Sequence, residues 1–203
     1  MAVQNLPMAI EVRRISGEGI TRYLADAAGL RISVFREYPY LYEGDEAAER
    51  DYLASYAECP RSVFVLALDG DKVVGVSTGL PMADADESFQ APFMNAGYEV
   101  REWFYFGESV LDPAYRGQGI GHRFFDEREG HAADLGFAKT CFCSVVRPDD
   151  HPLKPVDYRP HDVFWIKRGY VKRPELSAEF AWKQVDSAGD EVSNSLVFWT
   201  RER

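Results

Sequence analysis

The sequence of 203 residues has few cysteines, few histidines and no long hydrophobic run. Its three cysteines are too few and odd in number for a disulfide framework, and its four histidines lack metal-ligand spacing. No stretch approaches the ~18 consecutive apolar residues of a membrane span. Residues 1–14 lack the basic start and long apolar core of a signal peptide. We therefore expect a cytoplasmic protein that has no membrane segment and no metal.

Basic residues are also in deficit, because 23 Lys and Arg stand against 33 Asp and Glu, a formal net charge of −10. An acidic chain repels nucleic-acid phosphates on average, so no nucleic-acid partner is expected, and it attracts cations. The 46% of hydrophobic residues excludes a disordered protein. The length predicts a single domain over residues 1–203 and leaves a monomer and a homodimer open.

Hydrophobic periodicity predicts strands and helices in mixed order. Strands are expected over residues 10–15, 62–68, 72–79, 103–111, 137–146, 176–185 and 196–200. Helices are expected over residues 19–35, 46–58, 120–135 and 162–168, with a short helix or a lid over 84–96. The predicted fold class is α/β (α+β mixed), built around one mixed sheet.

The most informative segment is the strand-to-helix step Arg116-Gly117-Gln118-Gly119-Ile120-Gly121. Its glycines let a ligand approach the backbone, and the first helical turn offers unpaired N–H groups to a phosphate. A nucleotide P-loop would have Lys and Ser or Thr where His122 and Arg123 stand, and a dinucleotide fingerprint would have glycine at His122. The segment predicts another kind of phosphate or pyrophosphate site, or else a tight turn that binds nothing.

With the preceding Leu111-Asp112-Pro113, this segment resembles the GNAT superfamily of acyl-CoA-dependent N-acyltransferases. In that family an apolar-x-Pro step ends a strand, and Arg/Gln-x-x-Gly-x-Gly/Ala opens a helix. Residues 164–170 are a second, weaker match, a short helix ending in Gly-Tyr. The resemblance implies a sheet of about seven strands, flanked by helices and splayed between the fourth and fifth strands.

The resemblance also implies that acetyl-CoA is the acyl donor and that no metal takes part. The backbone at Val110 and Leu111 would hold the thioester, and the amides of residues 118–121 the pyrophosphate. The implied donor-binding residues are Val110, Leu111, Arg116, Gly117, Gln118, Gly119, Ile120 and Gly121.

The chain departs from the family pattern at two positions. Trp165 stands where the family often has a Tyr that protonates the leaving thiolate, and Arg147 stands where an Asn often follows the fifth strand. Tyr170 is our candidate acid, with Tyr158 or a water as alternatives. The missing Tyr leaves an alternative function open, a catalytically inactive acetyl-CoA-binding sensor or partner module.

Glu108 is the candidate general base. A protonated amine must lose a proton before it attacks a thioester, and a partly buried carboxylate near the opening suits that task. Glu108 lies three residues before Leu111. The alternative is a glutamate that faces solvent or pairs with an arginine such as Arg101 or Arg116.

The acceptor site is predicted in the aromatic and acidic loop of residues 37–43. Tyr40 and Tyr42 combine with its carboxylates to suit a cationic amine, although tyrosines that pack on the core would give the same pattern. We expect an N-acetyltransferase that moves the acetyl group to a primary amine of a small molecule or peptide by direct attack in a ternary complex. The acidic charge favours a polyamine, an amino sugar or a basic peptide.

Residues 75–79 match the G-x-S-x-G pattern of a nucleophile elbow around Ser77. That motif needs a strand, a sharp turn and a helix. The apolar run continues beyond Gly79, so we expect a strand and no serine nucleophile.

Overall fold

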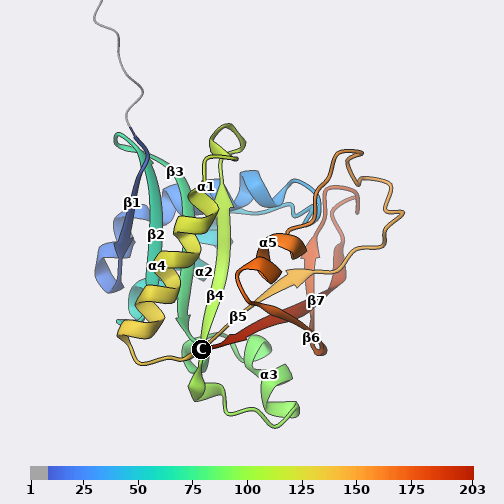
Figure 1. Cartoon of the computed structure of the whole chain (residues 1–203). Helices are drawn as coiled ribbons and strands as arrows, with labels where there is room; N and C mark the ends of the chain where they lie inside the picture. The colour runs from blue at the N-terminus through green and yellow to red at the C-terminus, as the bar shows by residue number, and fades with distance from the viewer. Residues whose placement is uncertain (1–8) are drawn as a thin grey trace, which may run out of the picture.

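The computed structural model describes residues 9–203. Residues 1–8 lie outside the described residues. The predictions that they are part of the same domain and do not form a signal peptide therefore stay predictions. A seven-stranded sheet crosses the molecule in the order β1-β2-β3-β4-β5-β7-β6 (Figure 1). Its strands are β1 (Glu11–Ile15), β2 (Val63–Asp69), β3 (Lys72–Pro81), β4 (Trp103–Leu111), β5 (Lys139–Val145), β6 (Val171–Lys183) and β7 (Glu191–Glu202). The predicted fold class, one mixed sheet of about seven strands flanked by helices, is confirmed.

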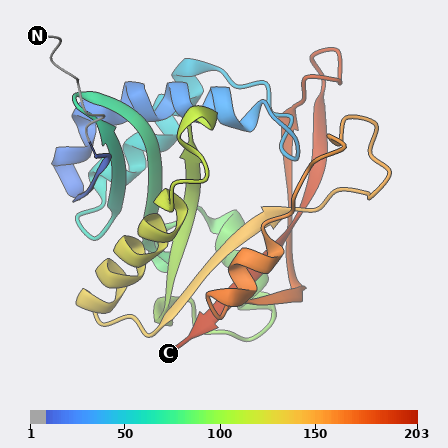
Figure 2. The same cartoon turned by 45° about the horizontal axis from the view of Figure 1, so that its top comes forward.

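Helices cover both faces of this sheet (Figures 1 and 2). They are α1 (Leu24–Phe35), α2 (Glu46–Glu58), α3 (Glu87–Asn95), α4 (Ile120–Asp134) and α5 (Asp162–Lys167). α4 and α5 lie on one face, α1 and α2 lie on the other, and α3 packs beside β6. Among residues 9–203, no helix combines the length and apolar character needed to cross a membrane.

Burial on both faces explains the unbroken apolar run of β2. Val63 and Val65 belong to the hydrophobic cluster under α4, whereas Phe64 and Leu66 belong to the cluster under α1 and α2. All four side chains are fully buried. A strand in this position has no solvent-facing side and therefore shows no polar alternation.

The sheet opens between β4 and β5, its one parallel pair among the described strands. The two strands pair only where Trp103–Tyr105 meets Lys139–Cys141, although they continue to Leu111 and Val145. Figure 2 shows them diverging towards their ends. Beyond Tyr105, the β4 edge that faces β5 lacks a strand partner, so its backbone N–H and C=O groups are free to bind another hydrogen-bonding group. The predicted splay between the fourth and fifth strands is confirmed.

A β-bulge in β4 determines which side chains face the α1–α2 side. Ser77 pairs with Ser109 whereas Gly79 pairs with Phe106, so three steps along β4 match two along β3. Side chains alternate along a regular strand, and Tyr105 and Glu108 would then point to opposite faces. The extra residue brings both of them to the same cavity.

Several predicted boundaries differ from the structure. The strands predicted over 176–185 and 196–200 begin earlier, at Val171 and Glu191. The register of β6 shifts around Pro174, which is tolerated because β6 is an edge strand. The helix predicted over 19–35 starts with a 3₁₀ segment, Gly17–Tyr23, before α1.

Residues 75–79 lie inside β3, where no strand-to-helix turn exists. Ser77 is fully buried, and its Oγ shares a hydrogen bond of 2.7 Å with Ser109 Oγ. The expectation that this motif is strand and not a nucleophile elbow is confirmed.

Candidate active site

The glycine loop before α4 leaves a row of backbone donors free. Gly117 and Gly119 both have a φ of +78°, and a Cβ at either position would meet open space. Within residues 9–203, the N–H groups of residues 118–121 donate no hydrogen bond. The positive end of the helix dipole adds to these donors, which makes the start of α4 a place for an anion.

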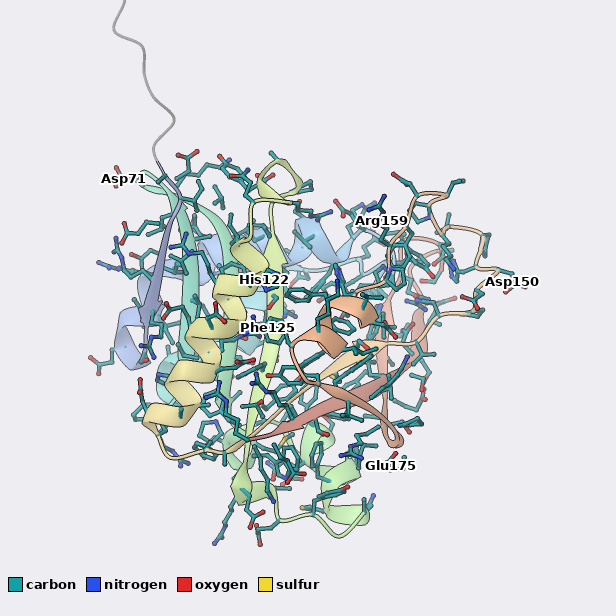
Figure 3. The ribbon with its side chains drawn as sticks, in the orientation of Figure 1. Asp71, His122, Phe125, Asp150, Arg159 and Glu175 are labelled. Carbon is teal, nitrogen blue, oxygen red and sulfur yellow. The ribbon has the colours of Figure 1, made fainter. Side chains whose placement is uncertain are left out.

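α5 packs beside α4 next to this loop. His122 and Phe125 lie on the side of α4 that faces α5 (Figure 3), and both rings contact Phe164, with centroid distances of 4.8 and 5.5 Å. Trp165 packs on Phe142 and Trp199 and carries no group that titrates near neutral pH. The gap between β4 and β5 is thus bordered on this face by two packed helices.

The other donor-site candidates lie at the end of β4. Val110 is fully buried, and the half-buried Leu111 packs into the cluster under α4. Arg116 Nη1 lies 3.0 Å from Glu37 Oε2, and its Nε donates to the Leu111 carbonyl at 3.4 Å. The structure therefore places the residues that were predicted to bind the acyl donor around the open end of the β4–β5 gap.

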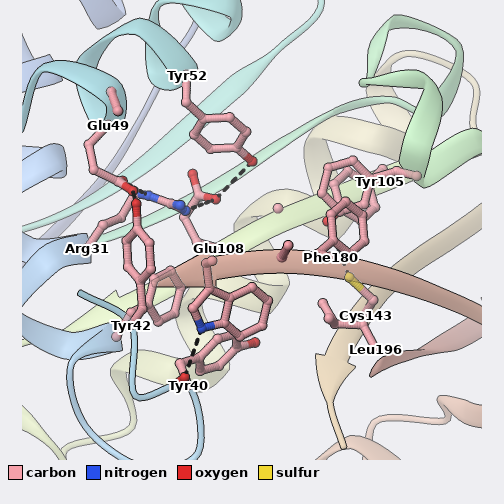
Figure 4. A pocket seen from close by; sticks show the side chains of 16 residues that line it. Arg31, Tyr40, Tyr42, Glu49, Tyr52, Tyr105, Glu108, Cys143, Phe180 and Leu196 are labelled. Atoms are coloured by element: carbon pink, nitrogen blue, oxygen red, sulfur yellow. Dashed lines mark hydrogen bonds and ion pairs between the residues drawn. The ribbon is translucent and has the colours of Figure 1, made fainter. Parts of the chain in front are cut away.

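A cavity of about 310 Å³ lies on the opposite face of the sheet (Figure 4). Both diverging strands line it, through Gly107 and Glu108 of β4 and Cys143 of β5. Its remaining walls come from α1, α2, α3, β6, β7 and the loop before α2. The size is at the lower end of the range for small-molecule sites.

Arg31 lies between two carboxylates at one end of this cavity (Figure 4). Its Nη1 is 2.5 Å from Glu108 Oε2, and its Nε donates to Glu49 Oε2. Burial lowers the pKa of Arg31, but the charges of Glu108 and Glu49 and the nearby Tyr52 more than offset this effect and raise it. Arg31 is therefore a permanent cation.

Glu108 takes part in three hydrogen bonds besides its ion pair with Arg31. Thr78 Oγ1 donates to its Oε1 at 2.9 Å and Tyr52 donates to its Oε2 at 3.4 Å, while its own backbone N–H donates to Thr78 Oγ1. The side chain is only 3% exposed. Of the alternatives considered for this residue, an arginine pair is observed, but its partner is Arg31 and not Arg101 or Arg116.

Tyr40 and Tyr42 both line the cavity. Tyr42 donates to Glu49 Oε1 at 2.7 Å, and Tyr40 packs against Phe35 with a centroid distance of 4.4 Å. Burial raises the pKa of both phenols above the ordinary value, so both stay protonated near neutral pH. The loop before α2 thus supplies aromatic surface to the cavity, and a role of these tyrosines in acceptor binding stays a prediction.

Tyr170 lies elsewhere, in the cluster under α4. Its hydroxyl is 3.0 Å from Thr140 Oγ1 and donates to Glu129 Oε1 at 3.2 Å, and the residue is 2% exposed. Burial raises its pKa above the ordinary value. Tyr158, the other tyrosine considered as acid, packs edge-on against Tyr38.

Only Tyr40, Tyr42 and Glu108 of the residues that line the cavity were predicted from the sequence; the residues missed include the polar side chains of Arg31, Glu49 and Tyr52. A signal for two of them exists in the helix pattern. Arg31 follows the buried Ala27 by four residues, and Glu49 precedes the buried Leu53 by four. A charged residue on the apolar stripe of a helix is seldom buried without a partner, so it marks a polar site.

Comparisons with known proteins agree with this geometry. The sequence matches the profile of the acetyltransferase (GNAT) family over residues 30–155, more than half of the chain. No curated protein is similar enough in sequence to count as a match.

Solved structures resemble the whole chain. A polyamine N-acetyltransferase from Drosophila melanogaster has a TM-score of 0.58 at 14% identity, covering 96% of this chain and 100% of that one. A GCN5-related N-acetyltransferase from Kribbella flavida has a TM-score of 0.57 at 16% identity, with 96% and 98% covered. A proposed acetyltransferase from Salmonella typhimurium, solved with its cofactor acetyl-CoA, has a TM-score of 0.57 at 11% identity, with 96% and 94% covered.

At these identities the structural likeness shows the fold, and the family follows from the sequence profile. The splayed β4–β5 pair was predicted from the family resemblance, and the glycine loop at α4 contains the motif on which that resemblance rests. This chain belongs to the acetyltransferase (GNAT) family.

Proposed function

We propose that this protein transfers the acetyl group of acetyl-CoA to a primary amine of a small molecule or peptide, by direct attack within a ternary complex. One observation carries the proposal. The β4–β5 gap has free backbone donors at the start of α4 on one face and a cavity that contains Glu108 on the other. A donor and an acceptor that enter from opposite faces would meet in this gap.

The residues around the gap fit acetyl-CoA. The free N–H groups of residues 118–121 suit its pyrophosphate, and the open space at Gly117 and Gly119 lets that group approach. The unpaired edge of β4 up to Leu111 offers backbone groups to the amide-bearing arm. When bound, acetyl-CoA supplies a thioester whose carbonyl carbon the amine attacks.

Glu108 takes up the proton that the ammonium form of the acceptor must lose. It is the one β4 carboxylate that lines the cavity, and the Thr78 hydrogen bond holds its Oε1 in place. The neutral amine then forms the new C–N bond, and the C–S bond breaks as the thiolate leaves. The second amine proton passes to solvent, because Glu108 still holds the first one.

Water protonates the leaving thiolate. A free thiol has a pKa of about 8.5, so its thiolate is a stable leaving group near neutral pH. Water is preferred over Tyr170, the candidate from the sequence, because the Tyr170 hydroxyl is buried and donates to Glu129.

The test combines acetyl-CoA binding by calorimetry with thiol release over an amine panel. Gly119→Glu places a negative side chain among the free N–H groups and should abolish binding. Gly97→Glu is the matched control, because Gly97 also has a positive φ, +81°, and open space at Cβ. It should bind as the wild type does. Glu108→Gln should keep binding but lose about 100-fold or more in turnover.

Each outcome has a clear reading. If neither the wild type nor the control binds acetyl-CoA, the donor site is refuted. If both bind and no amine releases thiol, the alternative of an inactive sensor module, which Trp165 keeps open, replaces the enzyme.

A further inference from the structure

The cavity that is open to Glu108 is polar at one end and aromatic at the other. On the basis of the proposed function, we infer that its acceptor is a monoamine attached to an aromatic body, an arylalkylamine, and not a polyamine or an amino acid.

The aromatic end is formed by Tyr105 of β4 and Phe180 of β6 (Figure 4). Phe89 of α3 packs against both of these rings. The Phe89 ring centroid lies 4.8 Å from that of Tyr105 and 4.7 Å from that of Phe180. Phe89 and Phe180 are only half-buried, so these rings keep apolar surface that a ligand can cover. Offset and tilted ring packing favours a further aromatic group at this place.

No charge balances a second ammonium at the aromatic end. The charged side chains lining the cavity are Arg31, Glu49 and Glu108, and all three meet at the other end. Burial raises the pKa of the Cys143 thiol to about 12, so this group is neutral near pH 7. An ammonium moved from water to the aromatic end would lose hydration without gaining a counter-ion.

A carboxylate on the acceptor is disfavoured at the charged end. Arg31 is already paired with two carboxylates, so the three side chains sum to one negative charge. An amino acid would bring its carboxylate beside Glu49 and Glu108. A lone ammonium, in contrast, complements the excess negative charge and lies next to the proposed base.

The test compares 2-phenylethylamine, putrescine and phenylalanine as acceptors of the wild-type protein. We expect kcat/KM for 2-phenylethylamine to exceed that for each of the others by at least about tenfold, the scale of burying one aromatic ring. Calorimetry on the acetyl-CoA-loaded and unloaded protein should show the same order of affinities. Equal or better use of putrescine or phenylalanine would overturn the inference.

Substitutions at Phe180 test the aromatic end directly. Phe180→Glu supplies the missing carboxylate, so the preference for 2-phenylethylamine over putrescine should fall by at least about tenfold, whereas Phe180→Leu should retain most of it. Val171→Glu is the control, because Val171 is an exposed apolar residue of the same strand outside the cavity. An unchanged preference in Phe180→Glu would count against the assignment.

Failure of the inference and failure of the proposed function look different. Thiol release with putrescine but not with 2-phenylethylamine removes the inference and leaves the acetyltransferase intact. If no amine releases thiol, the proposed function fails, and calorimetric selection of 2-phenylethylamine over putrescine still decides which amine the cavity recognises.

Discussion

At the scale of single residues, Gly107 determines how closely the bulge of β4 approaches its neighbours. A Cβ at this position would lie 2.6 Å from Thr78 Oγ1 and would also collide with the Tyr56 hydroxyl. Tyr56 is buried and Thr78 is a hydrogen-bond partner of Glu108, so neither has room to yield. The glycine is therefore needed for the position of the adjacent carboxylate.

Gly107→Ala should lower the free energy of unfolding by about 1–3 kcal/mol, the usual cost of overpacking, and should reduce turnover by displacing Glu108. Gly29→Ala is the control, because Gly29 lies in α1 with open space around its Cβ position. It should be neutral or stabilising by up to about 1 kcal/mol. Chemical denaturation and a thiol-release assay measure both effects, and a fully active and stable Gly107→Ala would contradict this account.

Glu108 could be predicted from the sequence because its place follows from its short distance to the glycine loop. Its partners could not, since Arg31 lies 77 residues and Thr78 lies 30 residues away along the chain. Only the packing of α1 on the sheet brings the Arg31 guanidinium to the carboxylate. Periodicity shows that Arg31 is on a helix, but it does not show which strand that helix covers.

At the scale of elements, Arg147 holds the loop before α2 against the hairpin of β6 and β7. Its guanidinium donates to the carbonyls of Pro39 and Tyr40 at 2.6 and 2.9 Å, and to the side chains of Asn194 and Gln184, both at 2.6 Å. The four acceptors come from three separate segments. The Arg at the position where the family often has Asn therefore supports one wall of the cavity.

Arg147→Ala should raise the KM of the amine severalfold, because the loop before α2 carries Tyr40, which lines the cavity. The affinity for acetyl-CoA should stay unchanged, because the free N–H groups of residues 118–121 lie outside this loop. Leaving the four acceptors without their donor should also reduce the free energy of unfolding by about 1–3 kcal/mol. Arg147→Lys should restore the KM only in part, since an ammonium cannot reproduce the planar fork. A parallel loss of acetyl-CoA affinity would show that the loop acts on the whole gap.

Element boundaries were predictable where the hydrophobic pattern is strong. The buried strands β2 and β4 were predicted to within one residue, because apolar side chains begin and end with them. β6 was predicted to start at Leu176, since the four residues before it, Lys172-Arg173-Pro174-Glu175, are polar or proline. Solvent-facing residues of an edge strand carry no hydrophobic signal, and the start of β6 is seen only in the pairing of residues 171–173 with β7.

At the scale of the whole molecule, the net charge of −10 gives the surface a field that attracts cations. The fold as a whole was predictable because one local motif identifies the family. The identity of the acceptor was not, because its cavity is assembled from segments spread between Arg31 and Leu196.

The KM for a cationic amine should rise about two- to fivefold between 0.05 and 0.5 M NaCl, because salt screens the attraction to the acidic surface. The value of kcat should change little, since the buried Arg31–Glu108 pair is screened much less. Steady-state kinetics over a salt series checks both. A KM that does not depend on salt would mean that the field of the protein has no part in acceptor capture.

Within the sheet, the short β4–β5 seam separates two groups of strands. On one side β1 to β4 pair with sequence neighbours, and on the other β5, β6 and β7 form their own antiparallel group. Three residue pairs join these groups within the sheet, and a bridge between Tyr42 and Gln184 joins them outside it, so the seam is where the sheet itself opens at least cost. A ligand that binds in the β4–β5 gap adds its binding free energy to the stability of the folded protein. It does so at the strand pair that has the fewest backbone contacts in the sheet, so ligand binding should oppose opening of the sheet at this seam.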